Sequence, residues 1–407
     1  MSETIKKAII GKPSQLLESL TESATLAMAR ISRELAQQGK DIVSLSLGEP
    51  DFDTPDFIKQ AANEAMQKNI THYPPVNGIL EVRQAIAKKF ERDNGLSYKA
   101  DQIVISTGAK QAIANAVYAL VNVGDEVIMP SPFWVSYAEL VKMAGGIPVL
   151  INATVENDFK ITPGQLREAI NEKTKLIIYS SPCNPTGSVY SRQELEAFAE
   201  IIESKEELYV ISDEIYELIN FTGGKTESIA SVGGMMDRTI TVNGVSKAFA
   251  MTGWRIGYIG APKWIADACN KMQGQITSGA NSIAQMAAKA AVEADPSVVK
   301  PMIDVFKKRR DLVYELLSEI PDIKVNLPEG AFYFFPDVSA YFGKSDGETT
   351  IKNGSDLSMY LLQKELVAVV AGGAFGDDNC IRISYAASEE VLKKAIARIK
   401  TGLSKLK

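Results

Sequence analysis

Residues that could do chemistry follow five short runs of apolar and β-branched residues along the chain. In order they are Gly108, Trp134, Asn184, Asp213 and Lys247. Because ligands bind beyond the carboxyl ends of the strands in an open α/β sheet, we expect these groups to converge on one rim. An amine can form a Schiff base with a carbonyl compound, and a carboxylate can face a positively charged ring nitrogen. The set therefore predicts a site for carbonyl chemistry on an aromatic cofactor.

Strands that alternate with helices must position these residues. Helix-like segments at 110–121 and 191–204 lie between short apolar runs. This alternation predicts an α/β fold with a mainly parallel, seven-stranded sheet that helices cover on both faces. The predicted strands are 102–106, 125–129, 147–151, 175–180, 208–212, 238–243 and 255–260.

A different pattern follows residue 290 and predicts a smaller α+β domain. It consists of a long helical stretch, three short strands and a final amphipathic helix that begins at Ser388. These elements are 298–319, 331–335, 366–370, 381–385 and 388–405. Residues 13–40 are predicted to form an N-terminal helical arm that can pack on this part. We therefore predict a large domain of residues 48–300 and a small domain of residues 1–47 together with 301–407.

The converging groups match what pyridoxal 5′-phosphate requires. This cofactor needs an amine for covalent attachment, an anion facing its ring nitrogen and a cradle for its phosphate. Gly108 and the amides of Ala109 and Lys110 stand at a predicted helix start, where phosphate binds well. Arg255, eight residues beyond Lys247, adds a guanidinium suited to bidentate contact with phosphate.

Five stretches together resemble the class I, fold type I, pyridoxal-phosphate-dependent aminotransferases. The closest resemblance is to the bacterial I-beta aspartate aminotransferase subgroup, and it runs from about Ser23 to Ser388. Any one stretch is weak evidence, but their joint occurrence in this order is highly specific. They are Leu47-Gly48-Glu49-Pro50-Asp51-Phe52, Asn184-Pro185-Thr186-Gly187, Ser212-Asp213-Glu214-Ile215-Tyr216, Ser246-Lys247-Ala248-Phe249 and Gly253-Trp254-Arg255-Ile256-Gly257.

The resemblance assigns roles around the cofactor ring. It implies that Lys247 attaches the cofactor and then moves the substrate proton, and that Asp213 pairs with the ring nitrogen. It implies that Asn184 and Tyr216 hydrogen-bond the phenolic oxygen, and that Trp134 stacks on the ring face. Asn184 and Trp134 are also expected to contact substrate.

The resemblance also assigns the phosphate and carboxylate contacts. Ser246 and Arg255 are expected to hold the phosphate, and Tyr73 is expected to reach it from the neighbouring subunit of a homodimer. Arg382 is expected to grip the substrate α-carboxylate, with the backbone of Gly48 beside it. The implied reaction is ping-pong transfer of an amino group between an amino acid and a 2-oxo acid.

A dicarboxylic substrate carries a distal carboxylate, so a site that selects it needs a second cation. In the I-beta subgroup a lysine in G-[GA]-K-Q provides it, which here is Lys110 of Gly108-Ala109-Lys110-Gln111. Ser23 and Thr25 also match that subgroup, although either could simply cap a helix. We therefore predict transfer from L-aspartate to 2-oxoglutarate, giving oxaloacetate and L-glutamate. A prephenate or broader-specificity aminotransferase and, less favoured, a β-lyase stay open as alternatives.

Composition and missing motifs argue against other functions. The net charge of −6 argues against a nucleic-acid partner. The sequence has no run of 18 consecutive apolar residues, so we expect no membrane span. The three widely spaced cysteines form no metal-binding pair and fit the cytoplasm. A G-x-G-x-x-G nucleotide motif is missing, and a single histidine rules out an H-E-x-x-H metalloprotease. We therefore expect no metal.

Overall fold

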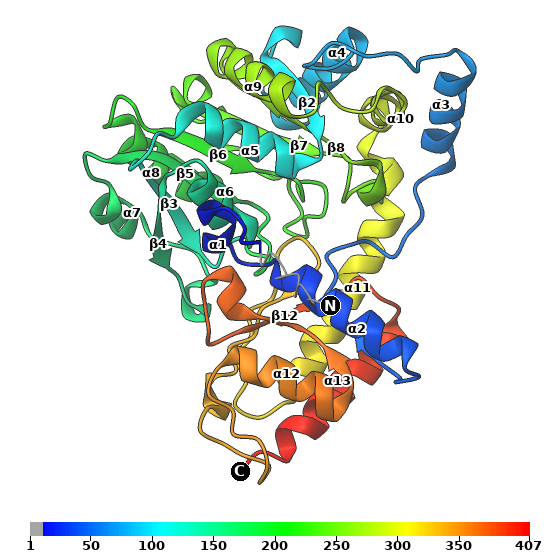
Figure 1. Cartoon of the computed structure of the whole chain (residues 1–407), viewed down its shortest axis with the longest axis vertical. Helices are drawn as coiled ribbons and strands as arrows, with labels where there is room; N and C mark the ends of the chain where they lie inside the picture. The colour runs from blue at the N-terminus through cyan, green and yellow to red at the C-terminus, as the bar shows by residue number, and fades with distance from the viewer. Residues whose placement is uncertain (1–10) are drawn as a thin grey trace, which may run out of the picture.

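A seven-stranded sheet forms the centre of the larger part of the molecule in the computed structural model, which describes residues 11–407 (Figure 1). The strand order is β2-β8-β7-β6-β5-β3-β4, and only β8 runs against the others. The predicted seven strands are confirmed, each end lying within two residues of its expected place. They are β2 (Ile103–Thr107), β3 (Glu126–Ser131), β4 (Ile147–Asn152), β5 (Thr174–Ser180), β6 (Tyr209–Asp213), β7 (Thr239–Gly244) and β8 (Ile256–Gly260).

Helices cover both faces of this sheet because its strands are apolar on both faces. Val127 and Met129 of β3 belong to one buried cluster, and Ile128 between them belongs to another. The first cluster packs under α5 (Ala109–Leu120), α6 (Ser136–Met143) and α9 (Lys263–Ile276). On the opposite face lie α7 (Pro163–Ala169) and α8 (Arg192–Glu203), and α5 and α8 confirm the two helices predicted between strands. Beside β2 and β8 pack α4 (Leu80–Lys89) and α10 (Ser282–Glu293), and α3 (Asp56–Gln67) packs on α10.

The C-terminal part combines three helices with two small sheets (Figure 1). Its helices are α11 (Lys300–Ser318), α12 (Gly354–Glu365) and α13 (Glu389–Ser404). Its strands are β9 (Tyr333–Phe334), β10 (Val367–Ala368), β11 (Val370–Ala371) and β12 (Ile381–Ser384). The helix predicted from Ser388 is confirmed, and the Ser388 side chain caps it by accepting from the amide of Val391. None of the helices in residues 11–407 is long and apolar enough to cross a membrane.

The single strand predicted at 366–370 is wrong, because this segment serves two sheets. Strand β10 pairs with β1 (Val43–Ser44), whereas β11 pairs with β12 in the antiparallel order β11-β12-β9. Val369 separates the two pieces and is fully buried. A local sequence pattern cannot reveal this change of partner, since both pieces are apolar and buried.

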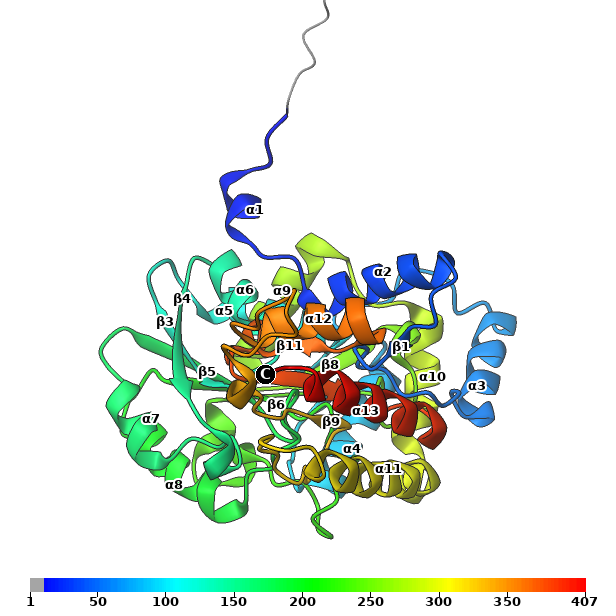
Figure 2. The ribbon, with the colours of Figure 1, turned by 90° about the horizontal axis from the view of Figure 1, so that it is seen from below.

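The N-terminal helical arm consists of two helices. Helix α1 (Gln15–Ser19) and helix α2 (Ala24–Gln37) are separated by a break at residues 20–23. Figure 2 shows α1 standing away from the body of the molecule. Strand β1, which follows α2, joins the C-terminal part through β10. The predicted division into two domains stays a prediction, and residues 1–10 of its small domain lie outside the described part of the chain.

Candidate active site

A cavity of about 330 Å³ lies at the carboxyl-end rim of the large sheet. Residues from the arm, from the strand-end loops and from β12 line it together. It is large enough for a cofactor of modest size with a small substrate. The predicted site residues on its wall are Thr25, Gly48, Ala109, Lys110, Trp134, Asn184, Asp213, Tyr216, Ser246, Lys247, Arg255 and Arg382.

Two predicted site residues are absent from this wall. Gly108 stands at the N-cap of α5 with a positive φ of 81°, directly behind the guanidinium of Arg255. A Cβ at Gly108 would collide with that guanidinium, so the backbone before α5 and Arg255 form one continuous surface. Tyr73 precedes α4 and is 96% exposed, so the chain does not bring it to its own cavity. Its expected role toward a neighbouring subunit stays a prediction.

Lys247 and Asp213 provide the amine and the carboxylate of the cavity. The Nζ atom of Lys247 donates to the backbone oxygen of Gly48 at 2.6 Å. Burial, helped by the charge of Arg382, lowers the pKa of Lys247 to about 8, so a useful fraction of the amine is neutral at physiological pH.

The Asp213 carboxylate is held at the end of β6 by two donors. Its Oδ2 accepts from the Tyr137 hydroxyl at 2.7 Å, and its Oδ1 accepts from the Ile215 amide at 3.2 Å. Burial raises the pKa of Asp213 to about 6. A buried carboxylate of this kind gains from a cationic partner, because a positive charge offsets the loss of water.

Arg382 lies 1% exposed on β12 and is fixed from several sides. Its Nη1 donates to Asn184 Oδ1 at 3.0 Å, and its Nη2 donates to the backbone oxygen of Ser46 at 2.6 Å. The guanidinium carbon lies 4.6 Å from the ring centre of Tyr333 and 4.8 Å from that of Phe375. Its Nε has no hydrogen-bond partner among the described residues. Because the buried guanidinium keeps an unpaired N–H donor beside the cavity, it is suited to bind an anionic ligand.

Lys110 lies at the mouth of the cavity. It is exposed and lies in the first turn of α5, with its Nζ 4.9 Å from the ring centre of Trp134. Although the residue as a whole is exposed, neighbouring protein atoms remove part of the water around its amine, and this desolvation, followed by the charge of Arg255, lowers the pKa of Lys110. Ser23 and Thr25 of the arm line the same cavity. Ser23 occupies the N-cap position of α2, but its side chain makes no capping hydrogen bond.

Residues 40–399 of the chain match the family model of aminotransferase class I and II. A bifunctional aspartate aminotransferase and glutamate/aspartate-prephenate aminotransferase of Petunia hybrida is 48% identical over 395 residues, which cover 96% of this chain and 82% of that protein. The chain belongs to the class I and II aminotransferases.

Bacterial proteins resemble this aminotransferase over nearly its full length. An aspartate/prephenate aminotransferase of Cereibacter sphaeroides is 45% identical, with 95% of this chain and 97% of that protein covered. The solved aspartate aminotransferase from Rhizobium meliloti superposes with a TM-score of 0.94 at 39% identity, covering 98% of this chain and 100% of that one. An aspartate aminotransferase from Thermus thermophilus with maleate gives a TM-score of 0.90 at 39% identity, covering 97% and 100%.

The cofactor of this family is pyridoxal 5′-phosphate, and the cavity fits it. Arg255 and the start of α5 form a cationic surface of the kind that phosphate prefers. Asp213 offers a buried carboxylate that a protonated ring nitrogen would neutralise, and Lys247 offers the amine for attachment. When bound, the cofactor supplies an electron sink for the charge left on the substrate carbon.

Two buried tyrosines complete the site and were not predicted from the sequence. Tyr137 of α6 holds Asp213, and Tyr333 of β9 hydrogen-bonds the hydroxyl of Tyr216 at 2.8 Å. Tyr333 lies in the aromatic run 331–335, which reads simply as a core strand. Tyr137 lies three residues after Trp134 on a helix face that is otherwise core. The available signal was the hydroxyl group of a tyrosine at a core position, since a buried tyrosine hydroxyl needs a hydrogen-bond partner.

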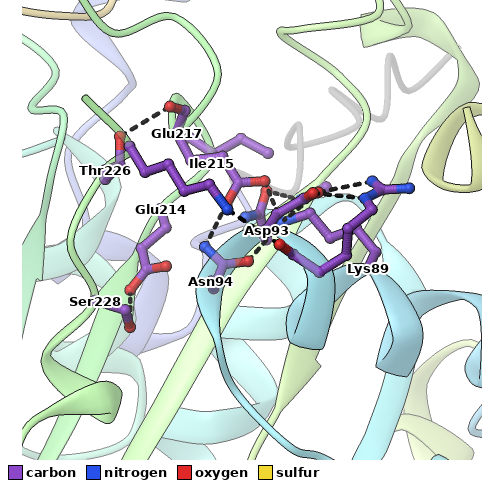
Figure 3. Close-up of polar contacts among 12 residues, drawn as sticks. Lys89, Asp93, Asn94, Glu214, Ile215, Glu217, Thr226 and Ser228 are labelled. Carbon is purple, nitrogen blue, oxygen red and sulfur yellow. Dashed lines mark hydrogen bonds and ion pairs between the residues drawn. The ribbon is translucent and has the colours of Figure 1, made fainter. Parts of the chain in front are cut away.

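A polar cluster anchors the segment that carries Asp213 and Tyr216 (Figure 3). The carboxylate of Glu217 forms an ion pair with Lys89 at the end of α4 and accepts from Asn94 Nδ2 at 2.8 Å. Lys89 Nζ also donates to Asn94 Oδ1 at 2.9 Å. Lys89 and Glu217 are both buried, so each needs the other to offset its lost hydration. The cluster therefore ties the residue after Tyr216 to α4.

Glu214 fills the space on the other side of the same segment. Its Oε1 accepts from the hydroxyl of Ser228 at 2.6 Å (Figure 3). The same oxygen accepts from the hydroxyl of Ser212 at 2.9 Å. Burial raises the pKa of Glu214 to about 8, so its neutral form dominates at neutral pH. Asp213 is therefore the charged member of this adjacent pair near pH 7.

Proposed function

We propose that this aminotransferase transfers the amino group of L-aspartate to 2-oxoglutarate, giving oxaloacetate and L-glutamate. The observation that carries the proposal is the presence of two separate cations, Arg382 and Lys110, on one cavity wall with Lys247. One cation can bind the α-carboxylate that every amino acid has, and the other can bind the distal carboxylate of a dicarboxylic substrate. The names of the Petunia and Thermus relatives support the same substrate class.

We propose these roles for the residues that meet at the cavity. Lys247 attaches the cofactor and moves the proton at the substrate carbon, while Asp213 neutralises the ring nitrogen. Asn184 and Tyr216 donate to the phenolic oxygen, and Trp134 covers the ring. The remaining contacts fall into two groups. The phosphate end is held by Gly108, Ser246, Arg255 and the backbone amides of Ala109 and Lys110, and the substrate by Gly48, Thr25, Arg382 and the side chain of Lys110.

Prephenate is the rival acceptor, and the Cereibacter relative is named for both substrates. The same two cations suit it, because prephenate also carries two carboxylates. A panel of donors and acceptors separates the candidates: aspartate, glutamate, alanine and phenylalanine with 2-oxoglutarate, and prephenate with aspartate or glutamate. Fastest turnover with aspartate and 2-oxoglutarate supports the proposal. Release of ammonia and pyruvate without an acceptor would instead indicate a β-lyase.

Lys110 is expected to select dicarboxylic substrates. Lys110→Met keeps the aliphatic stem over Trp134 but removes the charge, so KM for aspartate should rise by about 10- to 100-fold. KM for alanine, which lacks a distal carboxylate, should change little. The matched control is Lys142→Met on α6, a lysine that pairs with Glu139 outside the cavity. Equal rises for aspartate and alanine would remove Lys110 from substrate selection.

We propose a homodimer as the working unit. Two features support it: Tyr73 is 96% exposed, and α1 buries none of its residues while carrying the exposed leucines Leu16 and Leu17. Figure 2 shows α1 reaching outward, where a second copy could cover it. An apolar arm and an exposed aromatic are typical of a surface that a partner buries.

Co-expression tests whether the neighbour supplies Tyr73. Tyr73→Phe and Lys247→Ala should each lower activity when present alone. In mixed dimers, the site with an intact Lys247 would receive Tyr73 from the Lys247→Ala subunit. Random assembly should then restore about a quarter of the wild-type activity. No recovery, with mixed dimers verified by affinity tags, would mean that Tyr73 does not act across an interface.

We also propose that the enzyme works in the cytoplasm. Its three cysteines, Cys183, Cys269 and Cys380, are free thiols, which suits a reducing compartment. Cell fractionation tests this placement.

A further inference from the structure

The hydroxyl of Tyr333 lies at a junction between the proposed cofactor site and the proposed substrate site. It is 2.8 Å from the hydroxyl of Tyr216, and a Cβ at Gly48 would collide with it. Its ring carries the guanidinium of Arg382 on one face, at 4.6 Å. Tyr216 and Tyr333 are both buried, so water does not compete for these contacts.

We infer that Tyr333 is a positioning residue for amino transfer: its hydroxyl donates to Tyr216, which leaves the Tyr216 hydrogen free to point at the phenolic oxygen of the cofactor. The inference rests on the proposed role of Tyr216. A phenol that accepts one hydrogen bond becomes a stronger donor in the next, because hydrogen bonds in a chain polarise one another. Tyr333 thereby strengthens the contact that favours a negative phenolic oxygen.

The direction of donation follows from the neighbours of the two phenols. Tyr216 is the only hydrogen-bond partner of the Tyr333 hydroxyl among the described residues. Within residues 11–407 the Tyr333 hydrogen therefore has no acceptor other than the Tyr216 oxygen, and leaving a buried donor without an acceptor is costly. Burial raises the pKa of both phenols, so each keeps one hydrogen to donate. Donation from Tyr333 to Tyr216 uses the Tyr333 hydrogen and leaves the Tyr216 hydrogen for a ligand in the cavity.

The hydroxyl and the ring of Tyr333 have separable effects. Tyr333→Phe removes the hydroxyl but leaves the ring under Arg382, so KM for amino acids should stay close to wild type. Tyr333→Leu removes both, so it should also raise KM for aspartate and alanine together, since Arg382 loses its cation–π contact.

The test is a spectrophotometric pH titration of the visible band of the bound cofactor. A weaker donor at the phenolic oxygen raises the pKa at which this band changes, because the protonated form is then less easily deprotonated. Tyr333→Phe should raise this spectroscopic pKa by roughly half a unit, and Tyr216→Phe should raise it further. The double variant should match Tyr216→Phe alone, because Tyr333 acts through Tyr216.

Tyr385→Phe is the matched control. Tyr385 is also a fully buried tyrosine next to β12, but its hydroxyl donates to the backbone oxygen of Ala331 at 3.0 Å. It should leave the spectroscopic pKa unchanged. An unchanged value for Tyr333→Phe, an equal shift for Tyr385→Phe or an additive shift in the double variant would each overturn the inference. A wild-type protein without a titrating visible band would instead overturn the proposed cofactor site, which keeps the two failures distinct.

Discussion

Replacing Lys247 with alanine is expected to abolish the visible absorbance band of the purified holoenzyme and to lower kcat by about 10⁴-fold or more. The Lys247 amine is the group in the cavity that combines partial burial, a hydrogen bond to Gly48 and a pKa of about 8. It can therefore attack a carbonyl as a neutral amine and later return as a general base. Its loss removes both the attachment of the cofactor and the proton transfer.

A second lysine provides the control for this prediction. Lys110 lines the same cavity, but it is exposed at the mouth, so Lys110→Met should keep the visible band. If Lys110 rather than Lys247 attached the cofactor, the band would be lost in Lys110→Met and kept in Lys247→Ala.

The pH dependence of cofactor attachment gives an independent measurement of the same amine. A lysine pKa lowered to about 8 means that the neutral, nucleophilic form dominates above pH 8 and falls about tenfold per pH unit well below it. When cofactor is added to apoenzyme, the rate at which the band appears should rise with pH and level off above about pH 8. A rate that keeps rising to pH 10 would mean that the cavity does not lower the pKa of Lys247.

Much of the large sheet could be predicted because its strands are buried on both faces and separated by helices. Runs such as 176–179 are apolar without interruption, and such runs are recognisable one by one. The strands of the two small sheets were harder to predict from the sequence. They are two to four residues long, and the position of Val369 between two sheets depends on pairing with distant segments. Pairing of that kind is set by tertiary contacts rather than by local pattern.

The members of the site could largely be predicted because they follow strands whose carboxyl ends share one rim. Asp213 ends β6 and Lys247 follows β7, and both line the cavity. Arg382 lies within a strand of the C-terminal part, and only the family resemblance singled it out before the structure. Tyr137 and Tyr333 were not predicted as site residues, because a tyrosine among apolar residues looks like a core residue until the hydrogen-bond partner of its hydroxyl is known.

The second largest effect is expected at Arg382. Arg382→Gln should lower kcat/KM by about 10²- to 10³-fold, because a buried cation that binds a carboxylate through hydrogen bonds contributes several kcal/mol. The loss should be similar for aspartate and alanine, since both carry the α-carboxylate. Steady-state kinetics with the two donors measures it, and the visible band should persist because the cofactor attachment is untouched.

The pattern across substrates distinguishes this cation from Lys110. Arg382→Lys restores a charge but not the planar fork that bonds Asn184 and Ser46, so it should recover only part of the activity. Were the loss in Arg382→Gln confined to aspartate, Arg382 would bind the distal carboxylate and the proposed orientation of the substrate would be reversed. An equal loss for both donors, beside a selective loss in Lys110→Met, would fix the α-carboxylate at β12 and the side-chain carboxylate at the start of α5.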